Sequence, residues 1–194
     1  QMKPYEAASQ GIARTFQNIA LFKGMSVLDN IMTGRTLKMN AGFLAQCLHI
    51  GPARNEEIEH RKKVEEIIDF LQIQSIRKTP VGRLPYGLQK RVELGRALAA
   101  EPELLLLDEP MAGMGPDESE SMVALLQSLR GEATILLVEH DMDAVFRLAD
   151  TISVLVAGQV IASGTPQDIK ESTAVKQAYL GDEAIASPTR QAAP

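Results

Sequence analysis

The stretch Leu104–Pro110, which reads LLLLDEP, decides the fold of this 194-residue chain. Its four leucines have the length and the continuous apolar character of a parallel strand that is covered on both faces. Residues Thr134 to Val138 form a second apolar run of this kind, and helical patterns lie before and between the two runs. Strands that alternate with helices predict right-handed crossovers and an α/β layer structure with a mostly parallel sheet.

The helical patterns define the expected organisation of the chain. Ser26 is suited to cap a helix that has Asp29 in its first turn, and apolar residues recur at helical spacing from Ala53 to Gln72. A further helix is expected from Leu88 to Ala100, and Ala157-Gly158-Gln159 predicts a hairpin turn between two strands. After Asp182 the composition shows no apolar period, so we expect a disordered tail. The expected parts are residues 1–25 (start of an α/β core), 26–100 (helical subdomain), 101–181 (rest of the core) and 182–194 (tail).

The composition excludes several classes of protein. The net charge is −5 and the charges of both signs are mixed, which argues against the basic face of a nucleic-acid binder. The single cysteine, Cys47, excludes a disulfide framework within the chain and a cysteine-rich metal site. No apolar run reaches the ~18 residues that a membrane-spanning helix needs. A membrane role would therefore require a partner.

Two carboxylates, Asp108 and Glu109, come directly after the four leucines. The carboxyl edge of an open α/β sheet is where ligands bind. Asp108 could hold Mg²⁺ through water, because this small hard cation prefers oxygen ligands. Glu109 could polarise a water that attacks a γ-phosphate. A buried strand that ends in a solvated acidic turn is the alternative for this motif alone.

The segment Leu84–Gln89, which reads LPYGLQ, places Gly87 at the start of the helix expected from Leu88. The free amides and the positive end of the dipole at such a start favour an anion. An ordinary helix that begins after a glycine is the alternative. The candidate nucleotide-binding residues here are Tyr86, Gly87, Leu88 and Gln89.

Two further polar residues extend the candidate site. His140 follows the second strand, at the same sheet edge as Glu109, and could hydrogen-bond the γ-phosphate and orient the water. Gln17 could contribute its amide oxygen to the magnesium shell or to the water. A structural or solvated histidine and a surface glutamine are the alternatives.

Together these segments resemble the ATP-binding cassette (ABC) ATPases, in the order typical of that family. They correspond to a glutamine loop, a helical subdomain, a signature motif, a Walker B strand, an aspartate loop and a histidine switch. The resemblance covers residues 12–181 and is closest to the cytoplasmic ATPases of branched-chain amino-acid importers. The supporting segments are residues 14–18 (RTFQN), the insert 34–65, residues 84–87 (LPYG), 138–142 (VEHDM) and 178–181 (AYLG).

The resemblance implies a P-loop NTPase-type α/β fold and transport-coupled ATP hydrolysis by a dimer, with ATP and Mg²⁺ as cofactors. Glu109 and His140 would be catalytic, and Asp108 and Gln17 would bind the metal. The implied partners are a second ATPase subunit and transmembrane permease subunits, with no nucleic acid, at the cytoplasmic face of the inner membrane. The alternatives are the ATPase of another ABC transporter, such as a lipopolysaccharide exporter, and a degenerate half-site module that does not hydrolyse ATP.

Three departures from the family pattern limit what can be carried over. The sequence has no G-x-x-x-x-G-K-S/T loop, so we expect that the N-terminal part with Walker A is missing and that this chain alone is inactive. Without that part we expect exposed strand edges and apolar surface. Pro85 replaces the signature serine of most members, and Gly115 stands where many relatives have aspartate.

Overall fold

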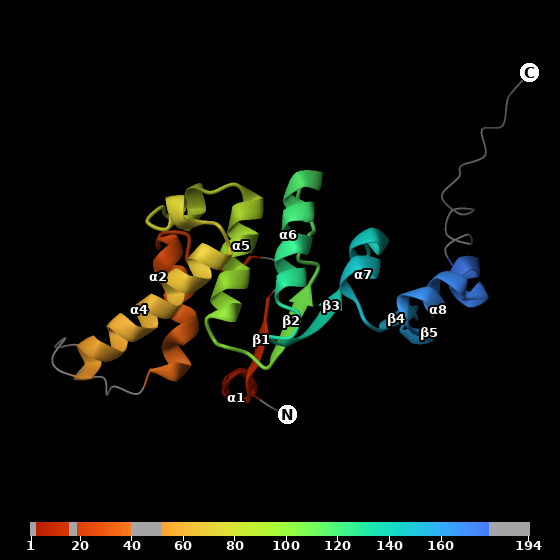
Figure 1. The fold of residues 1–194 in the computed structure, drawn as a ribbon, viewed down its shortest axis with the longest axis horizontal. Coiled ribbons are helices and arrows are strands. Elements are labelled where there is room, and N and C mark those ends of the chain that lie inside the picture. The colour runs from red at the N-terminus through yellow and green to blue at the C-terminus, as the bar shows by residue number, and fades with distance from the viewer. Residues whose placement is uncertain (1–2, 16–18, 40–51, 179–194) are drawn as a thin grey trace, which may run out of the picture. The chain divides into compact units, whose positions relative to one another are not determined.

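The structure, a computed structural model, describes residues 3–15, 19–39 and 52–178 (Figure 1). Gln17, Cys47 and the predicted disordered tail 182–194 lie outside these residues. The chain divides between His140 and Asp141 into two compact units, which are described separately.

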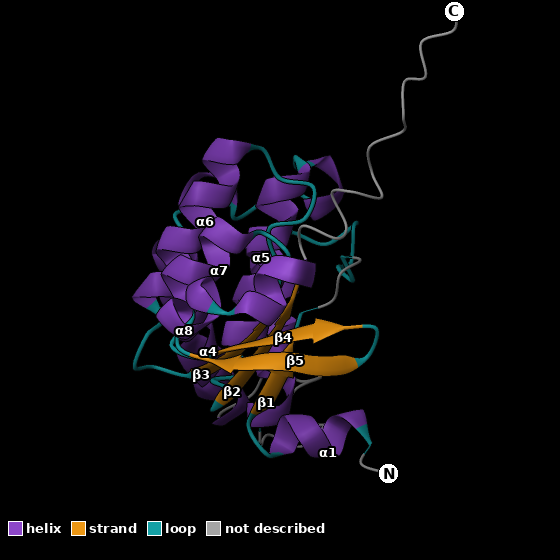
Figure 2. Ribbon diagram, turned by 90° about the vertical axis from the view of Figure 1, so that its right-hand side faces the viewer, coloured by secondary structure: helices purple, strands orange, loops and turns teal. Residues whose placement is uncertain are grey.

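The sheet of the first unit consists of three parallel strands: β1 (Ile12–Arg14), β2 (Leu104–Asp108) and β3 (Thr134–Val138). The LLLLD segment is the central strand, between β1 and β3, as Figure 2 shows. Leu106 is in register with Arg14 on one side and with Leu136 on the other. The prediction of a parallel α/β sheet built on this segment is confirmed.

Most of the helical residues of the first unit come between β1 and β2 in the sequence. Ser26 caps its helix as predicted, with its Oγ accepting a hydrogen bond from the amide of Asp29 at 3.1 Å. Figure 1 shows α2, α4 and α5 grouped together beside the sheet. The elements are α1 (Pro4–Ser9), α2 (Val27–Met32), η1 (Thr33–Lys38), α4 (Pro52–Phe70), η2 (Gln74–Ile76), η3 (Val81–Arg83), α5 (Tyr86–Leu98) and α6 (Pro116–Ser128).

The start of α5 differs from the prediction. The sequence predicts a helix that begins after Gly87, but the helix begins at Tyr86, so Gly87 is its second residue. Pro85 explains the difference, because its ring fixes φ near the value found here, −52°, and its extended ψ of 153° makes it the N-cap. Gly87 is therefore a residue of the first helical turn.

Among the described residues, the apolar core of the first unit buries one face of the sheet more fully than the other. In β2, Leu105 and Leu107 are fully buried, whereas Leu104 and Leu106 are half-buried. The prediction that β3 is buried on both faces is wrong, because Leu136 is 58% exposed and Val138 is 56% exposed. A continuous apolar run indicates a strand but does not establish that both of its faces are covered.

The second unit contains a helix, a hairpin and further helical residues. Its core consists of Ile152, Ile169 and Val175. Ala157 and Gly158 have φ values of 49° and 80° between two antiparallel strands, which confirms the predicted hairpin turn. The elements are α7 (Met142–Leu148), β4 (Ile152–Val156), β5 (Gln159–Gly164), α8 (Pro166–Glu171) and helical residues 173–178.

No helix in the described ranges is long and apolar enough to cross a membrane.

Candidate functional site

Asp108 and Glu109 stand at the carboxyl end of the central strand. Asp108 is the last residue of β2, and the amide of Glu109 donates a hydrogen bond to the carbonyl of Val138 at 2.9 Å. Glu109 has a φ of 47°, in the left-handed region that a residue with a side chain seldom adopts. Such a conformation costs on the order of 1 kcal/mol or more and persists only where its surroundings impose it. Both carboxylates are about 30% exposed, at 32% and 29%, so they are accessible to a ligand.

Arg14 is the direct partner of Asp108. Its guanidinium Nη2 donates to Oδ2 of Asp108 at 2.9 Å, from the end of the neighbouring strand β1. Both groups are partly exposed, so this ion pair contributes little to stability. Its effect is to orient the Asp108 carboxylate. The sequence motif included Arg14, but nothing in its pattern identified this pairing across 94 positions.

His140 lies beside Glu109, as predicted. Its Nδ1 is 3.8 Å from Oε1 of Glu109, and its side chain is 76% exposed. The structure therefore brings Asp108, Glu109 and His140 to one edge of the sheet, on two adjacent strand ends. Because the imidazole is mostly exposed, it can reach a ligand.

Glu139 is a residue of the candidate site that sequence reasoning missed. Its side chain is only 1% exposed. Oε1 accepts a hydrogen bond from the amide of Met111, and Oε2 accepts one from the amide of His140, both at 3.1 Å. Glu139 thus ties the loop after β2 to the end of β3. An acidic residue directly before the strand-end histidine was the available signal.

The start of α5 is a second candidate region, on a different element. α5 has 13 residues and is capped by Pro85, which has no side-chain donor or acceptor. In the described structure the amides of Tyr86, Gly87 and Leu88 have no acceptor, as expected for the first turn of a helix. The side chain of Gln89 donates to the carbonyl of Leu84 at 2.8 Å, so Gln89 supports the turn before the helix.

The residues at the sheet edge fit a magnesium ion that is bound mainly by other ligands. Among the described residues no group of three His, Cys, Asp or Glu side chains could hold a metal. Mg²⁺ commonly binds proteins through one or two carboxylates, with substrate phosphates and water completing its shell. Asp108, oriented by Arg14, can supply one such carboxylate, whereas Gln17 lies outside the described ranges.

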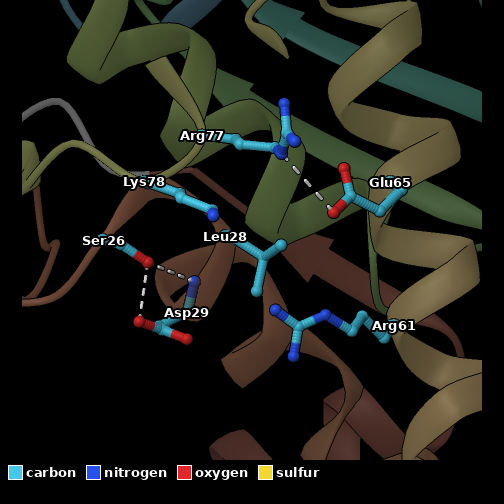
Figure 3. A pocket seen from close by; sticks show the side chains of 7 residues that line it. All are labelled: Ser26, Leu28, Asp29, Arg61, Glu65, Arg77 and Lys78. Carbon is cyan, nitrogen blue, oxygen red and sulfur yellow. Dashed lines mark hydrogen bonds and ion pairs between the residues drawn. The ribbon is translucent and has the colours of Figure 1, made fainter. Parts of the chain in front are cut away.

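A separate pocket of about 440 Å³ lies among the helices (Figure 3). The side chains that line it carry both positive and negative charges. Two of them form an ion pair, in which Arg77 Nε lies 3.8 Å from Glu65 Oε1. The lining residues come from α2, α4 and the segment after η2, and none of them belongs to the two candidate regions. They are Ser26, Leu28, Asp29, Arg61, Glu65, Arg77 and Lys78.

Comparisons with known proteins identify close sequence relatives. Residues 1–112 match the family model described as ABC transporter, and residues 159–185 match the model described as branched-chain amino acid ATP-binding cassette transporter. The branched-chain amino acid transport ATP-binding protein BraF of Pseudomonas aeruginosa is 36% identical over 92% of this chain and 71% of its own length. LivG of Escherichia coli K12 is 33% identical over 91% of this chain and 70% of its own length.

Solved structures give the same result for the fold. A nucleotide-free ATP-binding cassette from an ABC transporter superposes with a TM-score of 0.73 and 29% identity, over 92% of this chain and 72% of that chain. An ATP-binding cassette in its ADP conformation also gives a TM-score of 0.73, with 30% identity over 93% and 72% of the two chains. The fold is that of the ABC-type P-loop NTPases, and the chain belongs to the ATP-binding subunits of ABC transporters.

Proposed function

We propose that this chain is the ATP-binding subunit of an importer for branched-chain or related amino acids and that, in its intact form, the subunit hydrolyses ATP as one half of a dimer. The observation that carries the hydrolytic part is the grouping of Asp108, Glu109 and His140 at one sheet edge. The import part is supported by the similarity to BraF and LivG and by the branched-chain transporter model that matches residues 159–185.

Glu109 is the group that we assign to water activation. Its left-handed backbone and its hydrogen bond to the carbonyl of Val138 hold the carboxylate at the sheet edge. His140 Nδ1, 3.8 Å from the carboxylate, can approach to hydrogen-bonding distance when a ligand binds, since catalytic contacts often tighten only in the complex. His140 would then orient the water and contact the γ-phosphate.

Asp108 is the group that we assign to the metal. Arg14 holds its Oδ2 at 2.9 Å, which leaves Oδ1 for a water-mediated contact to Mg²⁺. When bound, Mg²⁺ supplies charge neutralisation at the phosphates. Gln17 is proposed as an additional ligand of the metal or the water. Glu139 acts as a support, because it fixes both the backbone of His140 and the loop after β2.

The start of α5 is proposed to serve the nucleotide held by the second ATPase subunit. Its unpaired amides point outward at the positive end of a 13-residue helix, which suits a phosphate. Because Pro85 offers no hydroxyl, this contact would rest on backbone amides and on Gln89. We propose a peripheral position at the cytoplasmic face of the inner membrane, where residues 26–100 and Gln17 transmit closure of the dimer to the permease subunits.

Substitution of Glu109 tests the hydrolytic part. In the full-length protein assembled with its partner subunits, Glu109→Gln should lower the rate of ATP hydrolysis by about 100-fold or more, the usual share of a general base. ATP binding should remain within about twofold, because the amide keeps the shape of the carboxylate. Glu132→Gln, an exposed glutamate outside the site, is the matched control. Hydrolysis by Glu109→Gln at the wild-type rate would contradict the assignment.

Transport assays distinguish the proposed substrate from the alternatives. The lipopolysaccharide export protein LptB of Acidithiobacillus ferridurans is 29% identical over 92% of this chain, so a lipopolysaccharide exporter is the second candidate. Vesicles that contain the ATPase with its permease subunits should show hydrolysis stimulated by a binding protein loaded with leucine, isoleucine or valine. Stimulation by lipopolysaccharide instead would support the exporter. A wild-type assembly without hydrolysis would support the non-hydrolysing half-site module.

A further inference from the structure

The carboxylate of Glu118, in the first turn of α6, lies against Gly87 in the first turn of α5. A Cβ atom built on Gly87 would lie 2.5 Å from both Cδ and Oε1 of Glu118 and 2.7 Å from Oε2. These distances are far below van der Waals contact, so a side chain at position 87 must displace the carboxylate. The carboxylate is also held from the other side, because Oε2 accepts a hydrogen bond from the amide of Gly115 at 3.3 Å.

Two further contacts lie beside the contact of Gly87 with Glu118, one towards the start of α5 and one further along α5 and α6. At the start of α5, the Tyr86 ring lies over Gly113, where an added Cβ would be 3.2 Å from Cε1. Gly113 has a φ of 76°, so both its backbone conformation and its closeness to the ring favour glycine. One turn further along both helices, Nη2 of Arg91 donates to Oγ of Ser121 at 2.6 Å. Together these contacts fix α5 relative to α6 and to the loop before α6.

The electrostatic setting of Glu118 is specific. Its negative charge lies at the end of α5 where the helix dipole is positive, which is a stabilising arrangement. The amides of Tyr86, Gly87 and Leu88 nevertheless keep no acceptor within the described structure. Glu118 therefore supports the helix start from the side and leaves those amides available.

We propose that Glu118 is a positioning residue that fixes the first turn of α5 relative to residues 111–115, the loop after β2. The phosphate-facing amides and this loop would then meet the second ATPase subunit as one preformed surface. Gly87 leaves room for the carboxylate beside the helix, and any side chain at this position would displace it. This inference rests on the proposed function and extends it from the residues that contact nucleotide to one that places them.

A double-mutant cycle on the full-length protein tests the role of Glu118. We expect Glu118→Ala to lower kcat of ATP hydrolysis by about 5- to 10-fold and to leave KM within about twofold, because positioning affects the assembled dimer and not ATP capture by one subunit. Gly87→Ala displaces the same carboxylate. The double variant should therefore lose no more than about twofold beyond Gly87→Ala alone, since the two changes remove one contact.

A second readout separates positioning from hydrolysis. In a Glu109→Gln background, ATP-dependent dimerisation measured by light scattering should weaken with Glu118→Ala by a similar factor, while ATP binding to the single subunit is retained. Glu118→Gln, which keeps the shape and the contact to the Gly115 amide, should behave as wild type in both assays. Asp117→Ala removes a neighbouring charge from the same helical turn and should change kcat by less than about twofold. Circular dichroism checks that each variant is folded.

Three results would overturn the positioning role. They are multiplicative losses in the double variant, an Asp117→Ala loss equal to that of Glu118→Ala, and loss of activity in Glu118→Gln. If the wild type hydrolyses ATP and any one of these results is found, the positioning role of Glu118 is wrong and the proposed function stands. If the wild-type assembly does not hydrolyse ATP, both the proposed function and this role fail.

Discussion

The helical region and the sheet of the first unit are packed in different ways. The described residues within 26–39 and 52–100 enclose a core in which Ile31, Val64 and Leu71 have no exposed surface. Among the described residues, the sheet is covered more fully on one face than on the other, where Leu136 is 58% exposed. The candidate hydrolytic residues therefore stand on the less enclosed of the two regions. The residues that contribute most to the stability of the fold are largely different from those proposed to act on ATP.

Truncation of one leucine in each region should separate them most clearly. Leu71→Ala removes a fully buried side chain and should lower the free energy of unfolding by about 3 kcal/mol, because it leaves a cavity. Leu136→Ala, on the open face, should cost less than about 1 kcal/mol. Urea denaturation of both variants measures the difference. Equal losses would mean that the open face of the sheet is covered in the protein.

The buried side chain of Asn30 in the helical region should contribute more to the free energy of unfolding than the exposed side chain of Thr134 in the sheet. Asn30 is fully buried and bonds both backbone groups of Phe22, at 2.9 and 3.0 Å. Asn30→Ala should cost about 2 kcal/mol, because buried backbone groups lose their partners. Thr134→Ala, at the exposed start of β3, should cost under about 0.5 kcal/mol. A small effect of Asn30→Ala in urea denaturation would show that water replaces the amide.

The cap of α2 gives a smaller and more local test. Ser26→Ala should lower the free energy of unfolding by about 1 kcal/mol, because the amide of Asp29 loses its acceptor. Ser26→Gly should cost only a few tenths of a kcal/mol, since water reaches the amide more easily beside glycine. Thermal unfolding of the pair reports the difference. Stability of Ser26→Ala equal to that of the wild type would argue that the cap adds nothing to the helical region.

The smallest expected effect is a pH dependence of the free energy of unfolding that comes from Glu101, just after the helical region. Burial raises the pKa of Glu101, but the hydrogen bond and charge of Arg35, with Lys38, outweigh it and hold the pKa below its usual value. A carboxyl with a lowered pKa stabilises the fold above its unfolded pKa, and the effect is lost as the pH falls through the folded pKa.

The matching variant is Glu101→Gln. Because the Glu101 side chain is 48% exposed, the change should cost only about 0.3 kcal/mol at neutral pH. The difference from wild type should disappear on acidification to about pH 3, below the ordinary range of glutamate. Urea denaturation across this interval measures it, and a difference that persists in acid would assign the effect to packing.

The sequence identified those parts of the fold that depend on local chemistry. LLLLDEP predicted the central strand, Ser26 predicted the cap of α2, and the turn at Ala157 and Gly158 predicted the hairpin. The rule that ligands bind at the carboxyl edge of a parallel sheet also placed His140 beside Glu109, at 3.8 Å. These features follow from period, turn chemistry and strand direction.

Contacts between distant segments could not be predicted in the same way. The pairing of Arg14 with Asp108 depends on the register of β1 against β2, and the contact of Glu118 with Gly87 depends on how two helices pack. The exposure of Leu136 depends on which layers cover the sheet. Such properties belong to the tertiary arrangement, and a single sequence without its relatives carries little information about them.

The left-handed backbone of Glu109 has a consequence for how this chain can change over evolutionary time. Glycine or asparagine would adopt a φ of 47° at lower cost, so mutation under selection for folding alone should drift toward them at this position. A lineage that no longer used the carboxylate would be expected to lose it early and to gain stability in doing so. Under the proposed role of Glu109, the glutamate is thus a marker by which active descendants can be told from inactive ones.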